Sequence, residues 1–563
     1  MADCWLITFG EDPRSTWHAA ACCTQPLGAR IARNGVSLWR RGMHATTRLF
    51  VASIALLGVA ACAPRPTLDP RPGMAVTAEL ARADALVRAG CYTCLKDALA
   101  IYERLATTGA APAANDLAID TLLLLALRER ELGLGAGRSL ERAIELAGRQ
   151  PPPFDIGVFQ SVADVQTWHA NGVPEERADA SIGPLRRMNI AWPRWRGELE
   201  PGAAAGLLRA YYLLSLDCTT RPILGDAGLE PWKAPPGAPP ILKFRAAVCP
   251  LSFDEEAIGD LLEHDPRFAE AHFFLGQLAF SRGALRTAER HLVESLDAIP
   301  ELGAAWVTLG HVYLMMEDID AASDAYRRAA AAIPGQRQAM LGVAKCLGYL
   351  GQYAEAVAIL DDMERLGTWY MGETYYWRAW NRHRLRQYDA ANNDVLAARR
   401  RLPMDGHVDK LAGFIALARN EVPRAESEFR EAVAHFEGRG ASDCEARYYL
   451  GSVQVMQRKW AEAAPNFEEA EPCYARDQRS LRERLDMIRS SDLPDERKAR
   501  IAAAKERDIA AARLQEARSA YNAAVALANL GELDKARPFA GRAAAHPEMK
   551  NLAEQLLARL GAP

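Results

Sequence analysis

A small residue returns at a nearly constant spacing through the second half of the chain, and this constrains the fold more than any other feature. Glycine or alanine recurs at intervals of 34, 34, 35, 34 and 38 residues, and an alanine follows each of them 12 residues later. Two helices cross closely only where their side chains are small, so the pattern predicts six antiparallel helical hairpins over about residues 265–475. The two series are Gly276, Gly310, Ala344, Ala379, Gly413 and Gly451, and Ala288, Ala322, Ala356, Ala391, Ala425 and Ala463.

Bulky residues and prolines complete this pattern. A bulky residue lies four positions after each second alanine, on the same helical face, where it fills the space between hairpins. These residues are Leu292, Tyr326, Leu360, Val395, Phe429 and Phe467. Pro300, Pro334 and Pro403 are placed to end second helices. The expected fold class is therefore all-α.

The stretch GAAWVTLGHVYLMMEDIDAASDAYRRAAAAIP, residues 303–334, resembles the helix-turn-helix repeat of tetratricopeptide proteins. Every signature position is filled, by Trp306, Leu309, Gly310, Tyr313, Ala322, Tyr326, Ala329 and Pro334. The resemblance implies a right-handed superhelical solenoid of such hairpins, which acts as a binding scaffold and not as an enzyme.

The repeat pattern weakens outside residues 265–475. Residues 75–150 are expected to form degenerate hairpins of the same kind, and residues 151–264 a helical module without repeats that contains a Pro-rich loop. Residues 476–563 are expected to hold a long helix that begins near Pro494, one further repeat and a capping helix with a polar outer face.

A short apolar run near the N-terminus predicts where the protein is located. The 13 residues Leu49–Ala61 are too few to span a bilayer, which takes roughly 20, but suit the centre of a secretory signal. The sequence VAAC that ends at Cys62 resembles the lipobox of bacterial lipoproteins, whose cysteine carries the lipid.

This resemblance implies a division of the first 74 residues. Residues 1–42 would be a non-native leader, 43–61 the signal peptide and 62–74 a flexible tether behind the lipid-bearing Cys62. The alternative is a genuine N-terminal tail with a weak membrane helix or a buried helix. The residue after Cys62 is Ala63, which resembles lipoproteins sent to the outer membrane, so we expect the periplasmic face of that membrane in the bacterial cell envelope.

The charge balance argues against nucleic acid as a partner. Residues 1–61 contain 6 basic and 3 acidic residues, so the remaining chain has 62 basic and 69 acidic residues and a net charge of −7. A surface that binds phosphate backbones needs a basic stripe, and the sequence has none.

Three pairs of cysteines are candidates for disulfides, which an oxidising compartment would permit. Cys444 begins the first helix of a repeat and Cys473 ends its second, so the two should meet; Cys218 and Cys249 flank the Pro-rich loop. Cys91 and Cys94 lie three residues apart in a lengthened turn, where a structural disulfide or two packed thiols is expected. A redox motif of this spacing would need a preceding strand, which is not expected here. Haem attachment would need a histidine directly after Cys94, and zinc would need two further ligands nearby; neither is present.

The sequence contains no catalytic, cofactor-binding or metal-binding signature. The resemblance instead implies a peptide-binding groove along the concave face, lined by Phe273, Gln277, His311, Lys345, Tyr376, Trp380, His383, Phe414 and Tyr448. The Lys and Asn clamp with which some family members hold a C-terminal carboxylate is absent. We therefore expect a peptide or helix with apolar anchors, supplied by a protein of an envelope complex. The alternative is an envelope redox or ligand-binding protein that uses Cys91 and Cys94 or the module at 151–250.

Overall fold

The computed structural model describes residues 72–134, 138–148, 253–366 and 371–561, and separate stretches between 206 and 249. Every regular element in this part of the chain is an α-helix. The expected leader, signal peptide, tether and Cys62 lie outside the described residues, as does most of the module expected at 151–264. No helix among the described residues has the length and apolar character needed to cross a membrane.

Six helical hairpins form the centre of the molecule, where the glycine and alanine spacing predicted them. We number them as repeats one to six, in chain order. Their helices are α10 Ala269–Ser281 and α11 Leu285–Ala298, α12 Gly303–Met315 and α13 Ile319–Ala332, α14 Arg337–Tyr349 and α15 Tyr353–Arg365, α16 Met371–Arg384 and α17 Tyr388–Arg401, α18 Gly406–Ala418 and α19 Val422–Gly438, and α20 Cys444–Met456 and α21 Trp460–Ser490.

The small residues permit the close crossings that their spacing predicted. A Cβ atom at Gly310 would lie 2.7 Å from the Tyr326 ring, and one at Gly342 in the next repeat would lie 2.4 Å from the same ring. Tyr326 therefore fills the space left by two glycines and joins repeat two to repeat three. The six alanines of the second helices are all fully buried, at Ala288, Ala322, Ala356, Ala391, Ala425 and Ala463.

The turn inside each hairpin passes through a left-handed residue at the same place. Glycine occupies it in repeats one and three, at Gly283 and Gly351, where φ is 73° and 80°. Side-chain-bearing residues occupy it in the other repeats, at Glu317, Arg386, Asn420 and Arg458, with φ between 60° and 62°. A left-handed conformation costs a residue with a Cβ roughly 1–2 kcal/mol, so the repeat packing holds these four turns in place.

The boundary expected at residue 475 is wrong, because α21 runs on to Ser490. Pro465 and Pro472 lie within this helix and each removes one backbone hydrogen bond. The helix continues because Leu481 and Leu485 are buried and give it an apolar face along its later turns.

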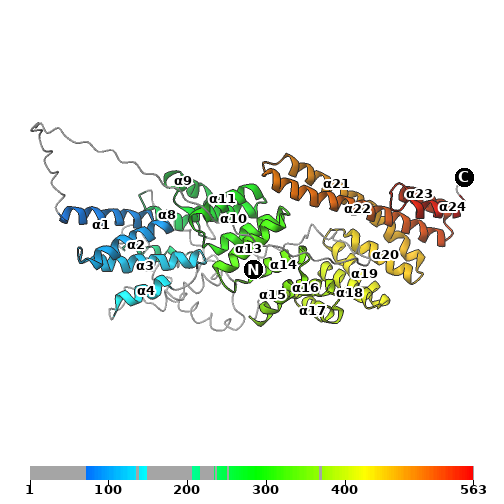
Figure 1. The fold of residues 1–563 in the computed structure, drawn as a ribbon, viewed down its shortest axis with the longest axis horizontal. Coiled ribbons are helices and arrows are strands. Elements are labelled where there is room, and N and C mark those ends of the chain that lie inside the picture. Colours follow the sequence, from blue (N-terminus) through cyan, green and yellow to red (C-terminus); the bar gives the residue numbers. More distant parts are fainter. Residues whose placement is uncertain are drawn as a thin grey trace, which may run out of the picture.

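The C-terminal region follows the expected order. Helix α22 spans Asp495–Asn529 directly after Pro494, α23 spans Leu533–Ala544, and α24 spans Lys550–Arg559 and closes the array. Helices α21 and α22 pack along one another as a long antiparallel hairpin. In Figure 1 this hairpin extends from the C-terminal end of the array back toward α11 and α13, above the arc formed by the middle repeats.

The N-terminal module lies at the opposite end of the molecule (Figure 1). Helices α1 Pro72–Ala89, α2 Tyr92–Thr107, α3 Ala114–Glu131 and α4 Arg138–Ala147 form two hairpins, at the place of the degenerate repeats expected at 75–150. Helices α8 Pro240–Ala247 and α9 Glu255–His264 lead from this module into repeat one. A buried apolar cluster that includes Cys91, Phe244 and Phe268 joins them.

Candidate interaction surface

The nine residues expected to line the groove differ in exposure. Phe273 is only 3% exposed, so it belongs to the core and offers a partner no surface. Gln277 is exposed, and the other seven are partly exposed. Those seven are His311, Lys345, Tyr376, Trp380, His383, Phe414 and Tyr448.

Trp380 is held by a cluster of aromatic rings from repeats three and four. Its ring centroid lies 5.7 Å from that of Trp377 and 5.8 Å from that of Tyr353, both in edge-to-face geometry. A Cβ atom at Gly348 would lie 3.0 Å from Trp380, so a glycine permits this approach. The indole is thus fixed in place by the array and keeps part of its surface exposed.

Lys345, which the sequence placed in the groove, is paired within the array. Its ammonium group forms an ion pair with Glu373 and lies 5.6 Å from the centroid of the Trp377 ring. Glu373 belongs to the first helix of the following repeat. The charge of Lys345 is therefore compensated by a residue of the array itself. The groove therefore has less positive character than its composition indicates.

His311 and His383 also contribute no charge near neutral pH. Burial lowers the pKa of His311 to about 4, with the positive charge of Lys345 acting in the same direction. Burial also lowers the pKa of His383 to about 4, and Arg384 adds to the shift. The ring of His383 lies 6.3 Å from that of Phe414 in repeat five. Both histidines therefore act as neutral, partly apolar side chains.

Tyr448 is engaged by the long hairpin. The Asn522 side-chain amide of α22 donates to the Tyr448 hydroxyl oxygen at 3.3 Å, and the Tyr448 ring lies 5.7 Å from that of Phe467. The remaining partly exposed aromatic positions are continuous over α16 and α18. We call Tyr376, Trp380, His383 and Phe414 the aromatic strip.

Buried charges between repeats are satisfied within the array. Arg378 in α16 donates to Asp394 at 2.7 Å and to Asp361 of the preceding repeat at 2.9 Å. Lys410 in α18 pairs with Asp443 of the following repeat at 2.8 Å. These pairs fix the angle between repeats and leave the aromatic strip as the distinctive chemistry of the middle repeats.

A charged contact ties the long hairpin to repeats one and two, and sequence reasoning missed it. Arg497 of α22 pairs with Glu289 of α11 and with Asp318 at the start of α13, at 2.5 Å for the latter. Its guanidinium carbon also lies 4.6 Å from the centroid of the Tyr313 ring. Arg500 adds a second pair to Asp318 at 2.7 Å. We call this contact the clasp.

The clasp extends to the strained turn of repeat two. Lys505 of α22 is only 1% exposed and pairs with Glu317 and, at 3.0 Å, with Asp508. Arg484 of α21 lies 3.4 Å from Glu317. Glu317 is also the left-handed residue of its turn. Both helices of the long hairpin thus contact one turn, about 180 residues away in sequence.

Three disulfides join the cysteine pairs that the sequence suggested. They are Cys91–Cys94, Cys218–Cys249 and Cys444–Cys473, with Cα atoms 4.9, 5.2 and 5.5 Å apart. Cys346 lies outside these disulfides and is buried. The Cys444–Cys473 bond fastens α20 to α21 before α21 leaves the array, which ties the base of the long hairpin.

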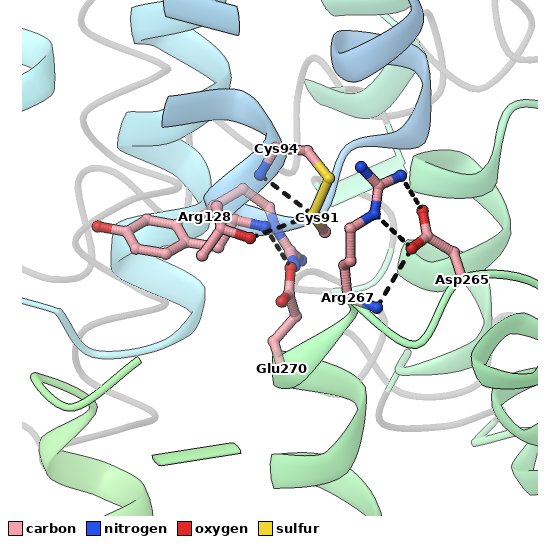
Figure 2. The surroundings of a disulfide bond; sticks show 8 residues. Cys91, Cys94, Arg128, Asp265, Arg267 and Glu270 are labelled. Atoms are coloured by element: carbon pink, nitrogen blue, oxygen red, sulfur yellow. Dashed lines mark hydrogen bonds and ion pairs between the residues drawn. A yellow bond between two sulfur atoms is a disulfide. The ribbon is translucent and has the colours of Figure 1, made fainter. Parts of the chain in front are cut away.

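The Cys91–Cys94 disulfide is enclosed by the junction between the N-terminal module and repeat one (Figure 2). The Tyr92 amide donates to the Glu270 carboxylate at 2.8 Å, and Glu270 also pairs with the fully buried Arg128. Cys91 and Cys94 are 0% and 1% exposed. Thiol exchange requires access of a thiolate to a sulfur atom, so this geometry fits a structural disulfide better than a redox centre.

A pocket of about 210 Å³ lies beside this junction, between α2, α3 and α4. Lys96, Arg138 and Arg142 line it together with Glu103 and Glu129. Burial raises the pKa of Glu129, and the Ser139 hydroxyl opposes the shift by donating to the carboxylate. Charges of both signs line this small space, and nothing in their arrangement indicates a particular ligand.

Comparison with known proteins identifies the repeat type. A tetratricopeptide repeat family model matches residues 303–335, which form repeat two. The expectation of tetratricopeptide repeats is therefore confirmed, as is the all-α fold class. No curated protein matches the chain.

Several solved structures are similar to parts of the chain. PilW, a widely conserved type IV pilus biogenesis factor, is 14% identical with a TM-score of 0.34, over 36% of this chain and 92% of its own. PilF of Pseudomonas aeruginosa is 16% identical with a TM-score of 0.33, over 37% and 92%. A tetratricopeptide repeat protein of Parabacteroides merdae is 13% identical with a TM-score of 0.33, over 46% and 92%. Similarity at this level carries no information about the partners of this chain.

Proposed function

We propose that this chain, which carries tetratricopeptide repeats, is a lipid-anchored scaffold of the bacterial cell envelope that binds a segment of a protein partner on its aromatic strip. The partner contributes a peptide or a helix with apolar anchors. The chain performs no chemistry on it. The lipid on Cys62 holds the scaffold at the membrane, on the periplasmic face of the outer membrane.

The aromatic strip is the observation that carries this proposal. Tyr376, Trp380, His383 and Phe414 are partly exposed and follow one another over two repeats. Aromatic residues dominate the energetics of protein interfaces, because a large ring buries much apolar area at low entropic cost. Neutral histidines and a paired Lys345 leave this strip suited to an apolar partner and not to an acidic one.

Fixed geometry adds to the argument. Trp377, Tyr349 and Tyr353 hold the Trp380 ring in edge-to-face contacts, so the ring loses little freedom when a partner binds. The clasp and the Cys444–Cys473 disulfide limit bending of the array around the strip. A preorganised surface of this kind favours recognition of an extended segment.

Affinity purification from the membranes of the native organism tests the strip. The native chain is compared with the double variant Tyr376→Ala/Trp380→Ala and with Leu396→Ala. Leu396 is the matched control, because it lies in the second helix of the same repeat and is 41% exposed. We expect one partner to be captured by the native chain and by Leu396→Ala and lost from the double variant, with circular dichroism confirming that the variant is folded. Equal capture by all three chains would contradict the proposal.

The anchor is tested separately. Substitution Cys62→Ser should release the protein from the membrane fraction into the soluble periplasm, and mass spectrometry of the native protein should find an acylated N-terminal cysteine at position 62. A membrane-bound Cys62→Ser variant would contradict the anchor without affecting the strip.

A further inference from the structure

Two histidines and a glutamate converge in repeat one, away from the aromatic strip and the clasp. His272 lies in α10, and His291 and Glu294 lie one turn apart in α11. The Nδ1 atoms of the two histidines are 2.9 Å apart. Glu294 Oε2 lies 2.9 Å from His272 Nδ1 and 3.7 Å from His291 Nδ1. Three potential ligand atoms thus meet within the reach of one metal ion.

The separations suit a tetrahedral zinc ion. Zinc bonds histidine nitrogen at about 2.0–2.1 Å and carboxylate oxygen at about 2.0–2.2 Å, so neighbouring ligand atoms of a tetrahedron lie about 3.3–3.4 Å apart. The three observed separations, 2.9, 2.9 and 3.7 Å, bracket that value. Shifts of a few tenths of an ångström in flexible side chains would therefore form three metal bonds.

The contact between the two histidines constrains their tautomers. The Nδ1 atoms lie 2.9 Å apart, a separation at which one of them donates a proton to the other. A metal ion needs both Nδ1 atoms unprotonated, so the donating ring would carry its proton on Nε2 in the bound state.

The same three repeat positions also converge elsewhere, with different occupants. In repeat five they are Asp409, Glu428 and Glu431, which again lie together. There Arg399 of the preceding repeat pairs with Asp409 at 2.7 Å and also with Glu428. A cation of the chain itself thus neutralises that cluster.

Repeat two carries a third combination of residues at these positions. The equivalents of His272 and Glu294 are Trp306 and Arg328, and the Arg328 guanidinium carbon lies 4.8 Å from the centroid of the Trp306 ring. In repeat one, within the described part of the chain, His272, His291 and Glu294 contact one another and no cation from a neighbouring repeat pairs with them. The repeat architecture therefore brings the three positions together, and of these three repeats only repeat one fills them with two histidines and a carboxylate.

We propose that His272, His291 and Glu294 bind a divalent transition-metal ion, with zinc the best match, and leave its fourth coordination position open to solvent. Two imidazole nitrogens and one carboxylate oxygen form a donor set that zinc accepts readily. His272 and His291 are 19% and 17% exposed, so the ion can enter from solvent.

Metal binding would strengthen the junction of the two parts of the chain. His272 lies two residues after Glu270, which holds the Cys91–Cys94 turn and Arg128. An ion that joins α10 to α11 would restrain the helix that carries Glu270. We therefore expect zinc to raise the unfolding temperature of the chain by stabilising repeat one and this junction.

Zinc titration of the full chain, purified without a polyhistidine tag, tests the proposal. Calorimetry against a competing chelator should find one equivalent bound. Removal of an outer-shell group at a metal site typically costs roughly 10–100-fold in affinity, so His291→Ala should weaken binding by at least that much. His264→Ala is the matched control, because His264 is exposed at the end of α9 and its Nδ1 is hydrogen-bonded to the Asp260 carbonyl. It should bind as the native chain does.

A second variant separates binding from folding. Glu294 is 44% exposed, so Glu294→Gln should leave the metal-free unfolding temperature unchanged while it abolishes the zinc-induced rise. Cobalt substituted for zinc should give visible d–d absorption typical of four-coordination by nitrogen and oxygen, and lose it in Glu294→Gln. The proposal is overturned if the native chain binds no stoichiometric zinc, or if His291→Ala or Glu294→Gln binds it as tightly as the native chain.

Discussion

Repeats two and three pack on one another through apolar side chains, whereas the long hairpin reaches repeats one and two through charged ones. The Tyr326 ring fills the space that Gly310 and Gly342 leave, and no charge takes part. At the clasp, Arg497 and Lys505 instead pair with acidic residues of α11 and the α12–α13 turn. Salt screens the partly exposed cations of the clasp, Arg484 and Arg500, and leaves close apolar packing almost unchanged. The packing of repeat two on repeat three and the closure by the long hairpin should therefore respond to different perturbations.

The largest effect is expected at a small residue of the array. Gly310→Leu would place a side chain where even a Cβ atom lies 2.7 Å from the Tyr326 ring. Overpacking of this kind should destabilise the fold by about 3 kcal/mol or more. Chemical denaturation followed by circular dichroism measures the loss.

Gly541→Ala is the matched control for this substitution. A Cβ atom at Gly541 in α23 would meet nothing within 4 Å. Alanine in a helix interior is favoured over glycine by roughly 0.5–1 kcal/mol, so this variant should be more stable than the native chain. If Gly310→Leu were equally well tolerated, the close crossing of α12 with α13 would not be required.

Lys505→Ala tests the clasp. It would leave Glu317 and Asp508 without their buried partner, and we expect a loss of about 2 kcal/mol that is confined to the clasp. Hydrogen exchange should rise in α22 near residue 505 and stay unchanged in α14–α19. Lys498→Ala on the same helix removes a long, partly exposed contact to Asp495 and should have little effect. Faster exchange throughout the array would show that the clasp and the repeats are not independent.

Substitutions at Glu317 and Arg386 compare the left-handed turn position of repeat two with that of repeat four. Both are left-handed residues, with φ of 62°. Arg386→Gly should stabilise the chain by about 0.5 kcal/mol, because relief of backbone strain exceeds the added entropy of the unfolded chain. Glu317→Gly should destabilise it by about 1 kcal/mol, since it also loses Lys505 and Arg484. Thermal unfolding measures both, and equal gains would mean that Glu317 contributes nothing to the clasp.

The smallest effect concerns the neutral histidines of the groove. The lowered pKa of His383, about 4, lies below the value of about 6.5 in an unfolded chain. Between these values the unfolded chain binds a proton that the folded chain does not. The free energy of unfolding is therefore unaffected by His383 above pH 6.5 and decreases as the pH falls toward 4. His383→Phe should flatten the pH dependence of stability in this window, by less than about 1 kcal/mol. An unchanged profile would contradict a buried neutral His383.

The sequence predicted the repeat array well because its determinants are local and periodic. Gly276 and Ala288 have equivalents in every repeat, and each pair fixes one crossing without reference to the rest of the chain. The start of α22 after Pro494 could also be predicted from the sequence, because the segment that follows Pro494 contains no helix-breaking residue. The proximity of Cys444 to Cys473 followed from the antiparallel course of the two helices of repeat six.

The end of α21, the clasp and the histidine cluster of repeat one could not be predicted, because they depend on contacts between residues that are not neighbours in the sequence. The repeat spacing placed the end of the array near residue 475, but buried leucines beyond that residue continue α21 to Ser490. Arg497 and Asp318 are 179 residues apart, and an arginine on a polar helix does not reveal its partner. His272 and His291 are 19 residues apart and look like scattered histidines in the sequence. Only the repeat register, which places them at convergent positions, could have indicated the metal site that we propose.

The central claim is that a protein partner lies on the aromatic strip, and site-specific photo-crosslinking in living cells tests it most directly. A photoreactive phenylalanine analogue would replace Tyr376, Phe414 or, as the control on the second helix of repeat four, Leu396. We predict that positions 376 and 414 crosslink to the same protein and that position 396 does not. A shared adduct at all three positions, or no adduct at 376 and 414, would contradict the account.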